Sequence, residues 1–345
     1  MQVLEQVPLA PYTTFGIGGP ARWFAEASSE DDVQEAIAFA RERQLLLFVL
    51  GGGSNLLVSD AGFPGVVLRI ALKGIEQSKP SAVTRFSVAA GENWDAFVSH
   101  AVSQSCGGVE CLAGIPGTVG GTPVQNVGAY GQEVSETICM VRAYDLETQC
   151  FVNLSASECG FAYRRSIFNS SARGRFIVTR VEYDLPANAK SVISYADLKR
   201  YFQDRNTSPS LAEVSAAVRE IRWKKGMLIV SGEADCRSAG SFFKNPVISA
   251  EHFEHVAADF AGVEVPRYPA GDGLVKVPAA WLLDQAGFHK GYVLGRAGIS
   301  SRHTLALINR GDASAADIAA LRDKIIAAVE AKFAIHLEPE PVWVG

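Results

Sequence analysis

The sequence lacks the features that mark secreted, metal-binding or membrane-spanning proteins. Its six cysteines, spread over 345 residues, include no C-x-x-C pair, and no histidine stands at metal-ligand spacing from them. We therefore expect buried thiols rather than a disulfide framework or a zinc site. No segment approaches the roughly 18 apolar residues of a membrane span, and the N-terminal residues lack a basic start and an apolar run. These absences predict a cytoplasmic protein with no metal, no signal peptide and no membrane insertion.

An excess of positive charge is also missing. Lysine and arginine number 32 against 37 aspartates and glutamates, which gives a formal net charge of −5. A general nucleic-acid-binding protein normally presents a basic face, so we expect no nucleic-acid partner. The length suffices for two or three domains, each with its own core, and the 32 glycines predict many tight turns and close backbone approaches.

The hydrophobic pattern predicts a mixture of helices and strands. Ser29 and the acidic residues after it resemble a helix start, and the apolar residues that follow recur on one helical face: Val33, Ala36, Ile37 and Ala40. A long helix is predicted over residues 315–333, with one apolar side made of Ile318, Leu321, Ile325, Val329 and Phe333. The remaining predictions are strands (45–50, 56–58, 66–70, 86–90, 176–183 and 334–337), a helix (94–105) and a turn (60–65).

The order of these elements divides the chain into three units. Residues 1–75 alternate helix and strand like a small α/β unit. Residues 76–213 mix strands with glycine-rich loops, and their last part, from residue 186 on, is expected to connect domains. Residues 214–345 form the third unit, in which the final predicted strand delivers Glu338 and Glu340.

Two glycine-rich segments are suited to a phosphate-bearing ligand. Residues 51–55 (Gly-Gly-Gly-Ser-Asn) follow a predicted strand, where their backbone N–H groups could surround a pyrophosphate; a plain tight turn is the alternative. They lack the Gly-Lys-Ser/Thr ending of a P-loop. Residues 114–131 combine glycines with apolar and amide residues, a composition that favours backbone lying flat against a planar ring and a pyrophosphate.

A third set of residues is suited to proton transfer beside a carboxylate. Ser241 supplies a hydroxyl, Arg164 a guanidinium and Glu340 a carboxylate. Taken singly, each has a structural alternative: a packed serine, a surface arginine and a solvated tail. Ser241 stands in no G-x-S-x-G motif, which argues against an acyl-transfer nucleophile. Together with a cofactor site, the three residues indicate a reductase that protonates a carbanion next to a carboxylate.

Two other patterns do not support a site. Residues 16–21 match G-x-G-x-x-A, but no buried strand precedes them and no clear helix follows, so they do not predict a Rossmann site. His252 and His255 share a helix face at i, i+3 without the H-E-x-x-H order, and we expect a solvated helix face there rather than a metal.

The motifs together resemble the UDP-N-acetylenolpyruvoylglucosamine reductase (MurB) family of bacterial peptidoglycan synthesis. Each motif alone is weak evidence, but the ordered set is specific and spans nearly the whole chain. The matching segments are residues 14–17, 51–55, 114–117, 125–131, 163–164, 240–246 and 337–340.

The resemblance implies an α+β fold of the vanillyl-alcohol-oxidase (PCMH) type. Two α/β subdomains, residues 1–75 and 76–213, would clamp a non-covalent FAD, and an α+β domain, residues 214–345, would bind the substrate. The implied reaction is reduction of UDP-N-acetylglucosamine enolpyruvate to UDP-N-acetylmuramate, with NADPH as co-substrate. This step belongs to cell-wall biosynthesis, and therefore to cell shape and division. We expect a monomer.

The roles of individual residues follow from the matching motifs. Ser241 matches the proton donor, Arg164 the active-site arginine and Glu340 the active-site glutamate. The residues implied for FAD are Gly51, Gly52, Gly53, Ser54, Asn55, Ile115, Pro116, Gly117, Thr118, Gly121, Asn126, Gly128 and Tyr130. The residues implied for the UDP-sugar are Tyr195, Arg222, Lys225, Asn245, Tyr268 and His303. The sequence leaves open whether Lys224 or Lys225 contacts phosphate, and the segment after Tyr195 resembles an extra substrate-covering loop.

Two alternative functions remain. An alcohol oxidase of the same fold would often tether its flavin through histidine or cysteine, and would then retain it on denaturation in acid. A non-catalytic UDP-sugar-binding protein would purify colourless and would show no NADPH oxidation.

Overall fold

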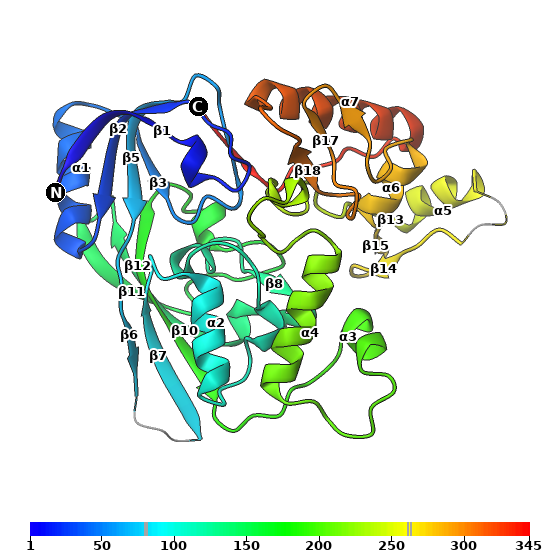
Figure 1. Ribbon diagram of the computed structural model, residues 1–345, viewed down its shortest axis with the longest axis horizontal. Helices are drawn as coiled ribbons and strands as arrows, with labels where there is room; N and C mark the ends of the chain where they lie inside the picture. Colours follow the sequence, from blue (N-terminus) through cyan, green and yellow to red (C-terminus); the bar gives the residue numbers. More distant parts are fainter. Residues whose placement is uncertain (79–81, 261, 263) are drawn as a thin grey trace. The chain divides into compact units, whose positions relative to one another are not determined.

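The chain forms two compact units, each assembled from segments that are distant in sequence (Figure 1). The structure is a computed structural model that describes residues 1–78, 82–260, 262 and 264–345. The first unit consists of Met1–Val7, Ala21–Gly53 and Pro64–Lys224, and the second of Pro8–Pro20, Ser54–Phe63 and Lys225–Gly345. Each unit has its own hydrophobic core.

The described part of the first unit contains a four-stranded and a five-stranded sheet, besides a short two-stranded hairpin. The strands of one sheet are β1 (Val3–Pro8), β2 (Pro20–Ala27), β3 (Leu47–Leu50) and β5 (Phe63–Ile70). Their order is β1-β2-β5-β3, with β3 and β5 parallel. The strands of the other sheet are β6 (Ile75–Gln77), β7 (Val83–Ala89), β10 (Ile138–Asp145), β11 (Cys150–Ser155) and β12 (Phe176–Pro186). This sheet is antiparallel, in the order β11-β10-β12-β7-β6.

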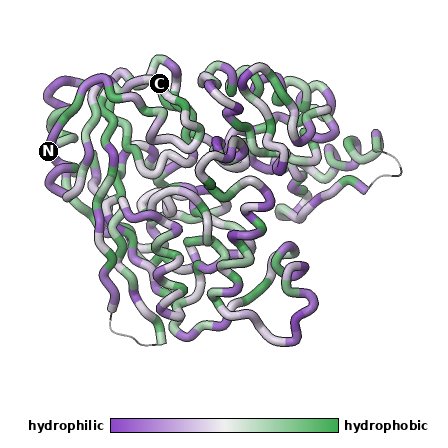
Figure 2. The backbone as a smooth tube through the Cα atoms, in the orientation of Figure 1, coloured by the Kyte–Doolittle hydropathy of each residue, from purple (hydrophilic) through white to green (hydrophobic). Residues whose placement is uncertain are grey.

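An aromatic cluster joins a helix to the five-stranded sheet. The helices of this unit are α1 (Glu30–Glu42), α2 (Trp94–Ser103), α3 (Ala196–Tyr201) and α4 (Leu211–Lys224). Phe97 of α2 lies 5.7 Å from Phe86 of β7 and 5.0 Å from Tyr183 of β12, measured between ring centroids. These rings are fully buried, and hydrophobic residues run along the same strands in Figure 2. Burial of such large rings makes this cluster a main source of stability in the unit.

Helix α1 confirms the prediction made from its cap and its apolar spacing. Ser29 is the N-cap, and its side chain and that of Asp32 form a reciprocal capping box. The four apolar positions predicted for the inner face are the buried ones. Capping satisfies backbone N–H groups that an α-helix leaves open, so the helix begins at the predicted residue.

The second unit is built from short strands and three helices. Its strands are β4 (Leu56–Val58), β13 (Val247–Ser249), β14 (Tyr268–Pro269), β15 (Leu274–Lys276), β16 (Val293–Leu294), β17 (Ala297–Ile299), β18 (Leu307–Asn309) and β19 (Val342–Val344). They pair as β13-β15-β14, β16-β17-β18 and β19-β4. The helices are α5 (Ala250–Ala258), α6 (Ala279–Gln285) and α7 (Ala315–Phe333). The parallel β4–β19 pair joins residues that are nearly 300 positions apart.

The long helix α7 has the predicted bounds and buries the predicted face. The strand predicted at residues 334–337 is wrong: these residues, all described, lie outside any strand. Ala334 takes a left-handed conformation (φ 52°) and donates its N–H to Glu330 O, which ends the helix in an irregular turn. The predicted turn over residues 60–65 is also partly wrong, because β5 already begins at Phe63.

The compact units have different boundaries from the three predicted ranges. Residues 8–20 and 54–63 group with the C-terminal part of the chain, and α4 groups with the first unit. The assignment of the three ranges to cofactor and substrate stays a prediction. Within the described part of the chain, no helix combines the length and the apolar character needed to cross a bilayer.

Asp32 is expected to make α1 sensitive to acid. Hydrogen bonds from Ser28 and Ser29 hold the pKa of Asp32 at about 2, below its ordinary value of 3.8. Because the pKa is depressed in the folded state, this capping contribution is present above about pH 4 and is lost as the pH falls toward 2. Asp32→Asn should lower the free energy of unfolding at neutral pH by about 0.5 kcal/mol and flatten its decline in acid.

Thermal unfolding between pH 7 and pH 2 measures this effect. Asp31→Asn is the control, since it removes a carboxylate from the same helix turn outside the capping box. An equal flattening in both variants would contradict the role of Asp32.

Candidate active site

Two glycine-rich loops of the first unit meet backbone to backbone. A Cβ built on Gly52 would lie 2.5 Å from the Cα of Gly117, and one on Gly51 would lie 2.9 Å from Thr118 Oγ1. Real Cβ atoms do not approach so closely, so these positions exclude side chains. The structure therefore brings together two of the segments predicted to contact FAD.

Gly121 tests whether these loops fit a cofactor. A Cβ on Gly121 would have no described atom within 4 Å, and the residue has no left-handed φ. Neither packing nor backbone conformation within the described structure therefore excludes a side chain there. The space beside this exposed backbone is open, so the described structure leaves room for a ligand there.

The loop that begins at Gly114 is fixed by two charged side chains. Asp95 of α2 accepts the Gly114 N–H at 2.5 Å, and Arg222 of α4 donates from Nε to the Gly114 carbonyl at 3.0 Å. Burial lowers the pKa of Arg222, while the charge of Asp95 and a hydrogen bond with Tyr130 oppose that shift. Arg219 forms an ion pair with Asp95. Arg222, predicted for the substrate, thus supports the loop that is predicted to contact the cofactor.

Arg164 lies in a tight turn whose two ends are hydrogen-bonded to each other. The Ala162 N–H donates to Arg165 O at 2.9 Å, and the Arg165 N–H donates to Ala162 O at 3.0 Å. Arg164 has φ 53°, at a turn position that usually carries glycine or asparagine. An arginine there bears backbone strain, as residues at functional sites often do.

Asn126, predicted to contact FAD, uses its side chain on protein partners. Its Nδ2 donates to Glu133 Oε2 at 2.8 Å and to Ala162 O at 3.1 Å, and its Oδ1 accepts the Ser135 N–H at 3.1 Å. The residue is 1% exposed. Asn126 thereby connects the segment before β8 (Gly128–Ala129) to the turn that carries Arg164.

The hairpin of β8 and β9 (Gln132–Glu133) packs against the predicted loop residue Tyr195, which directly precedes α3. The ring of Tyr195 packs edge-on against Tyr130, with centroids 5.4 Å apart. A side chain on Gly131 would collide with Ser194. The first unit therefore brings Tyr195 next to one predicted cofactor residue, Tyr130.

In the second unit, Ser241 and Glu340 lie on neighbouring segments. The N–H of Phe242, which follows Ser241, donates to Leu305 O at 2.8 Å, and the Phe242 carbonyl accepts the Glu340 N–H at 2.8 Å. Ser241 and Glu340 are both half-buried. Backbone pairing thus places the segments of Ser241 and Glu340, residues 99 positions apart, side by side.

Asn55 fixes the segment around Glu340. Its Nδ2 donates to the Glu340 carbonyl at 3.2 Å, and its own carbonyl accepts the Val342 N–H at 2.9 Å. Lys244 and Glu338 form an ion pair at 3.1 Å on the same pair of segments. A residue predicted for the cofactor thereby places a predicted catalytic residue.

The remaining predicted substrate residues of the second unit have separate surroundings. Asn245 Oδ1 accepts the Ala279 N–H at 2.9 Å, at the start of α6. Tyr268 is 58% exposed in β14. His303 Nδ1 accepts the Leu305 N–H at 3.1 Å, so this nitrogen carries no proton in that arrangement.

The predicted site residues are thus divided between the two units. The first unit holds Gly51, Gly52, Gly53, Ile115, Pro116, Gly117, Thr118, Gly121, Asn126, Gly128, Tyr130, Arg164, Tyr195 and Arg222. The second holds Ser54, Asn55, Lys225, Ser241, Asn245, Tyr268, His303 and Glu340. Sequence reasoning missed Asp95 and Arg219, because their partners are backbone and carboxylate groups that only the fold brings near.

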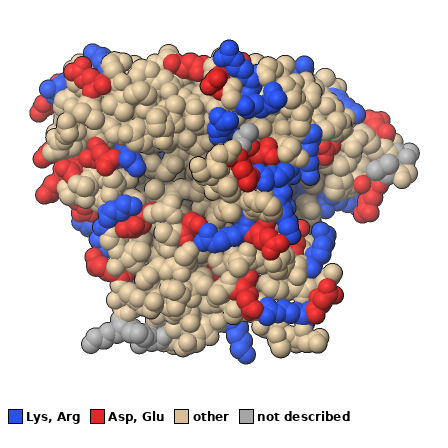
Figure 3. All heavy atoms as spheres, in the orientation of Figure 1, with Lys and Arg blue, Asp and Glu red and all other residues tan. Residues whose placement is uncertain are grey.

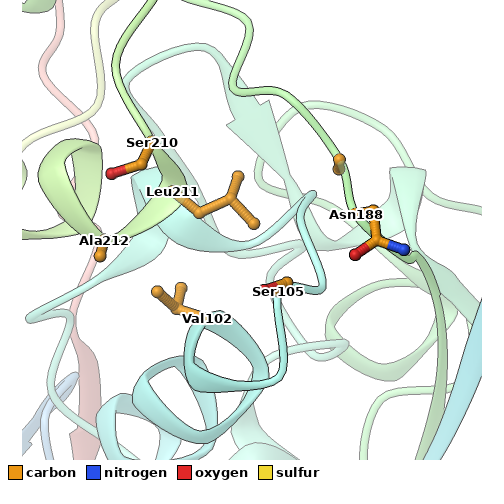
Figure 4. Close-up of a pocket in the computed structure, with 7 residues that line it drawn as sticks. Val102, Ser105, Asn188, Ser210, Leu211 and Ala212 are labelled. Atoms are coloured by element: carbon orange, nitrogen blue, oxygen red, sulfur yellow. The ribbon is translucent and has the colours of Figure 1, made fainter.

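Other features do not add to the site. A pocket in the first unit is lined by Val102, Ser105, Asn188, Ala189, Ser210, Leu211 and Ala212, none of which is a predicted site residue (Figure 4). His252 Nε2 lies 2.8 Å from Phe333 O, and no group of His, Cys, Asp and Glu among the described residues could hold a metal. Charges of both signs are scattered over the face seen in Figure 3.

Comparisons with known proteins cover the whole chain. A family model described as "UDP-N-acetylenolpyruvoylglucosamine reductase, C-terminal domain" matches residues 232–344, and one described as "FAD binding domain" matches residues 21–148. The UDP-N-acetylenolpyruvoylglucosamine reductase of Thermobifida fusca is 46% identical over 99% of this chain and 98% of its own length. The same enzyme of Chromobacterium violaceum is 41% identical over 99% of both chains.

A solved structure agrees with these matches. The crystal structure of the UDP-N-acetylenolpyruvylglucosamine reductase (MurB) from Thermus caldophilus is 27% identical, with a TM-score of 0.66 over 100% of both chains. The α+β fold with an FAD-binding part is thereby confirmed, as is FAD as the cofactor. The chain belongs to the UDP-N-acetylenolpyruvoylglucosamine reductase family and is an FAD-dependent oxidoreductase.

Proposed function

We propose that the protein reduces UDP-N-acetylglucosamine enolpyruvate to UDP-N-acetylmuramate, with NADPH as the reductant, in peptidoglycan synthesis. The observation that carries the proposal is the pairing of the Ser241 and Glu340 segments in a chain 46% identical to a reductase named for this substrate. We also propose that it acts as a monomer in the cytoplasm.

The loops around Gly52 and Gly117 would hold FAD without a covalent bond. Gly51, Gly53, Ser54, Asn55, Ile115, Pro116, Thr118, Gly121, Gly128 and Tyr130 would complete this set, and Asn126 would act through its backbone because its side chain is engaged. When bound, FAD takes a hydride from NADPH and supplies it to the enolpyruvyl group.

Arg164 would stabilise the charge that forms during the reaction. The terminal carbon of the enolpyruvyl double bond gains a hydride, which leaves negative charge shared between C2 and the neighbouring carboxylate. A guanidinium can contact such a carboxylate with two parallel N–H groups. A positive charge fixed in advance costs no reorganisation as the carbanion develops.

Ser241 would donate the proton that completes the reduction. A serine hydroxyl is a weak acid, but a carbanion is a strong base, so position decides the rate. Glu340, held on the adjacent segment, would interact with the developing enol as a protonated or proton-sharing carboxyl. The proton on C2 and the hydride on the terminal carbon together convert the double bond into a single bond.

A further set of residues is proposed to contact the UDP-sugar. Tyr195, Lys225, Asn245, Tyr268 and His303 are proposed to contact it. Arg222 is proposed to act on the substrate side only indirectly, since its Nε is held by the Gly114 carbonyl.

The flavin spectrum tests the proposed function. Anaerobic protein bleached with NADPH should recover its oxidised-flavin bands when UDP-N-acetylglucosamine enolpyruvate is added, because the substrate accepts the hydride. Bands that stay bleached would contradict the proposed substrate, and protein that binds no FAD would contradict the cofactor.

Ser241→Ala should separate the two half-reactions. Reduction of the flavin by NADPH should proceed normally, whereas reoxidation by the enolpyruvyl sugar should fall by a factor of about 100 or more, the size of a lost general acid. Stopped-flow absorbance measures both rates. Equal loss of both half-reactions would show a defect of folding or cofactor binding instead.

Arg164 should cost stability because of its backbone conformation. Arg164→Gly and Arg164→Ala both remove the guanidinium and should both abolish reoxidation by the substrate. Glycine tolerates φ 53° and alanine does not, so the glycine variant should be more stable by about 1 kcal/mol. Denaturant unfolding compares the two, and equal stability would show that the turn carries no strain.

A further inference from the structure

The turn that carries Arg164 is held from outside by an asparagine that the family motif did not single out. Asn169 Nδ2 donates to the Arg164 carbonyl at 3.1 Å. The N–H of the same peptide group, which belongs to Arg165, donates to Ala162 O at 3.0 Å. Both ends of the peptide after Arg164 are therefore hydrogen-bonded, and its rotation would break two bonds.

Asn169 is itself fixed by a second hydrogen bond. Its Oδ1 accepts the Ser166 N–H at 3.0 Å, as one half of a capping box on the short 3₁₀ helix Ile167–Asn169. The other half is Ser166 Oγ, which accepts the Phe168 N–H at 3.2 Å. One amide side chain thus caps a helix with its oxygen and holds the Arg164 peptide with its nitrogen.

This short helix is attached to the core of the first unit. Ser166 is fully buried and donates its hydroxyl to Val124 O at 2.6 Å. Phe168 is buried, and its ring lies 5.9 Å from that of Phe176 at the start of β12. Asn169 therefore presents its Nδ2 from a rigid base rather than from a free loop.

We infer that Asn169 is a positioning residue for Arg164 and sets the orientation in which its guanidinium is offered to the substrate carboxylate. The inference rests on the proposed function for the identity of that carboxylate. Arg164 has φ 53°, a conformation that a non-glycine residue keeps only when its surroundings hold it. Asn126 holds the first residue of the same turn through its hydrogen bond to Ala162 O. Asn169 supplies the hydrogen bond to Arg164 itself.

The consequence for catalysis is geometric. A forked contact between guanidinium and carboxylate tolerates little displacement, and misplacement of a reacting group by about 1 Å can slow a reaction roughly a hundredfold. Loss of one of the two bonds that hold the peptide should have a smaller effect. We expect reoxidation by the enolpyruvyl sugar to slow about tenfold, with reduction by NADPH unchanged.

Asn169→Asp isolates the bond to Arg164. Aspartate keeps the oxygen that accepts the Ser166 N–H, but it has no N–H to donate to the Arg164 carbonyl. The side chain is exposed, so the new charge stays solvated and the fold should be retained. Asn169→Ala adds no charge and should also slow reoxidation. Asn206→Asp is the control, because it makes the same chemical change at another exposed position.

A double-mutant cycle distinguishes positioning from a general structural effect. If Asn169 acts through Arg164, Asn169→Asp should slow reoxidation much less in an Arg164→Lys background, where the forked contact is already lost. Hydrogen exchange gives a readout that is independent of activity: the Arg165 amide should exchange faster in Asn169→Asp than in the wild type and in Asn206→Asp.

The outcomes separate this inference from the proposed function. Four results would each overturn the positioning role. In Asn169→Asp, these are reoxidation at the wild-type rate, equal slowing of both half-reactions, and unchanged exchange of the Arg165 amide. The fourth is additive effects in the double-mutant cycle. Wild-type protein that the enolpyruvyl sugar does not reoxidise would overturn the proposed substrate instead, and the exchange of the Arg165 amide would still decide whether the turn is held by Asn169.

Discussion

The close approach of two backbones at Gly52 and Gly117 is the constraint on which the predicted cofactor segments of the first unit depend. No side chain fits between the segments, so both must present bare peptide groups to whatever lies against them. Peptide N–H groups are hydrogen-bond donors that suit a pyrophosphate. The rest of the unit holds this arrangement in place: Asp95 and Arg222 fix the entry to the second segment by bonding opposite sides of one peptide backbone at Gly114.

The same principle recurs at the three residues that are proposed to take part in the reaction. Each of these residues is held through the backbone of its own segment. Asn169 donates to the Arg164 carbonyl, and Asn55 donates to the Glu340 carbonyl. Next to Ser241, the Phe242 N–H donates to the Leu305 carbonyl. Amides serve well in this task because each supplies both a donor and an acceptor without adding charge to the site.

Sequence reasoning succeeded where the signal is local. The bounds of α7 and the inner face of α1 follow from a 3.6-residue period and from capping residues, and both are confirmed. The reactive residues themselves came from an ordered set of motifs rather than from physical derivation. Motifs of this kind identify residues that touch a ligand. They do not record which other residues hold those ligand-binding residues in position.

One miss was local and the others were non-local. Ala334 was placed in a strand because the apolar pattern continues past α7, whereas its left-handed backbone turns the chain. The pairing of β4 with β19 could not be anticipated, since two three-residue strands carry no signal that identifies each other. Asn169 and Asp95 were missed for a related reason: a side chain that bonds a distant peptide group looks like any other polar surface residue in the sequence.

The β4–β19 pair has a consequence for how the protein is made. Residues 54–63 leave the ribosome early, yet the strand that pairs with β4 is only three residues long and ends at Val344. Loops of this length close slowly compared with local structure, and N-terminal regions otherwise tend to fold first during synthesis. The second unit therefore cannot be completed until residues 342–344 have been made. Glu340, two residues before β19, reaches its place in that last step, so a chain interrupted before it lacks both the closing strand and the carboxylate.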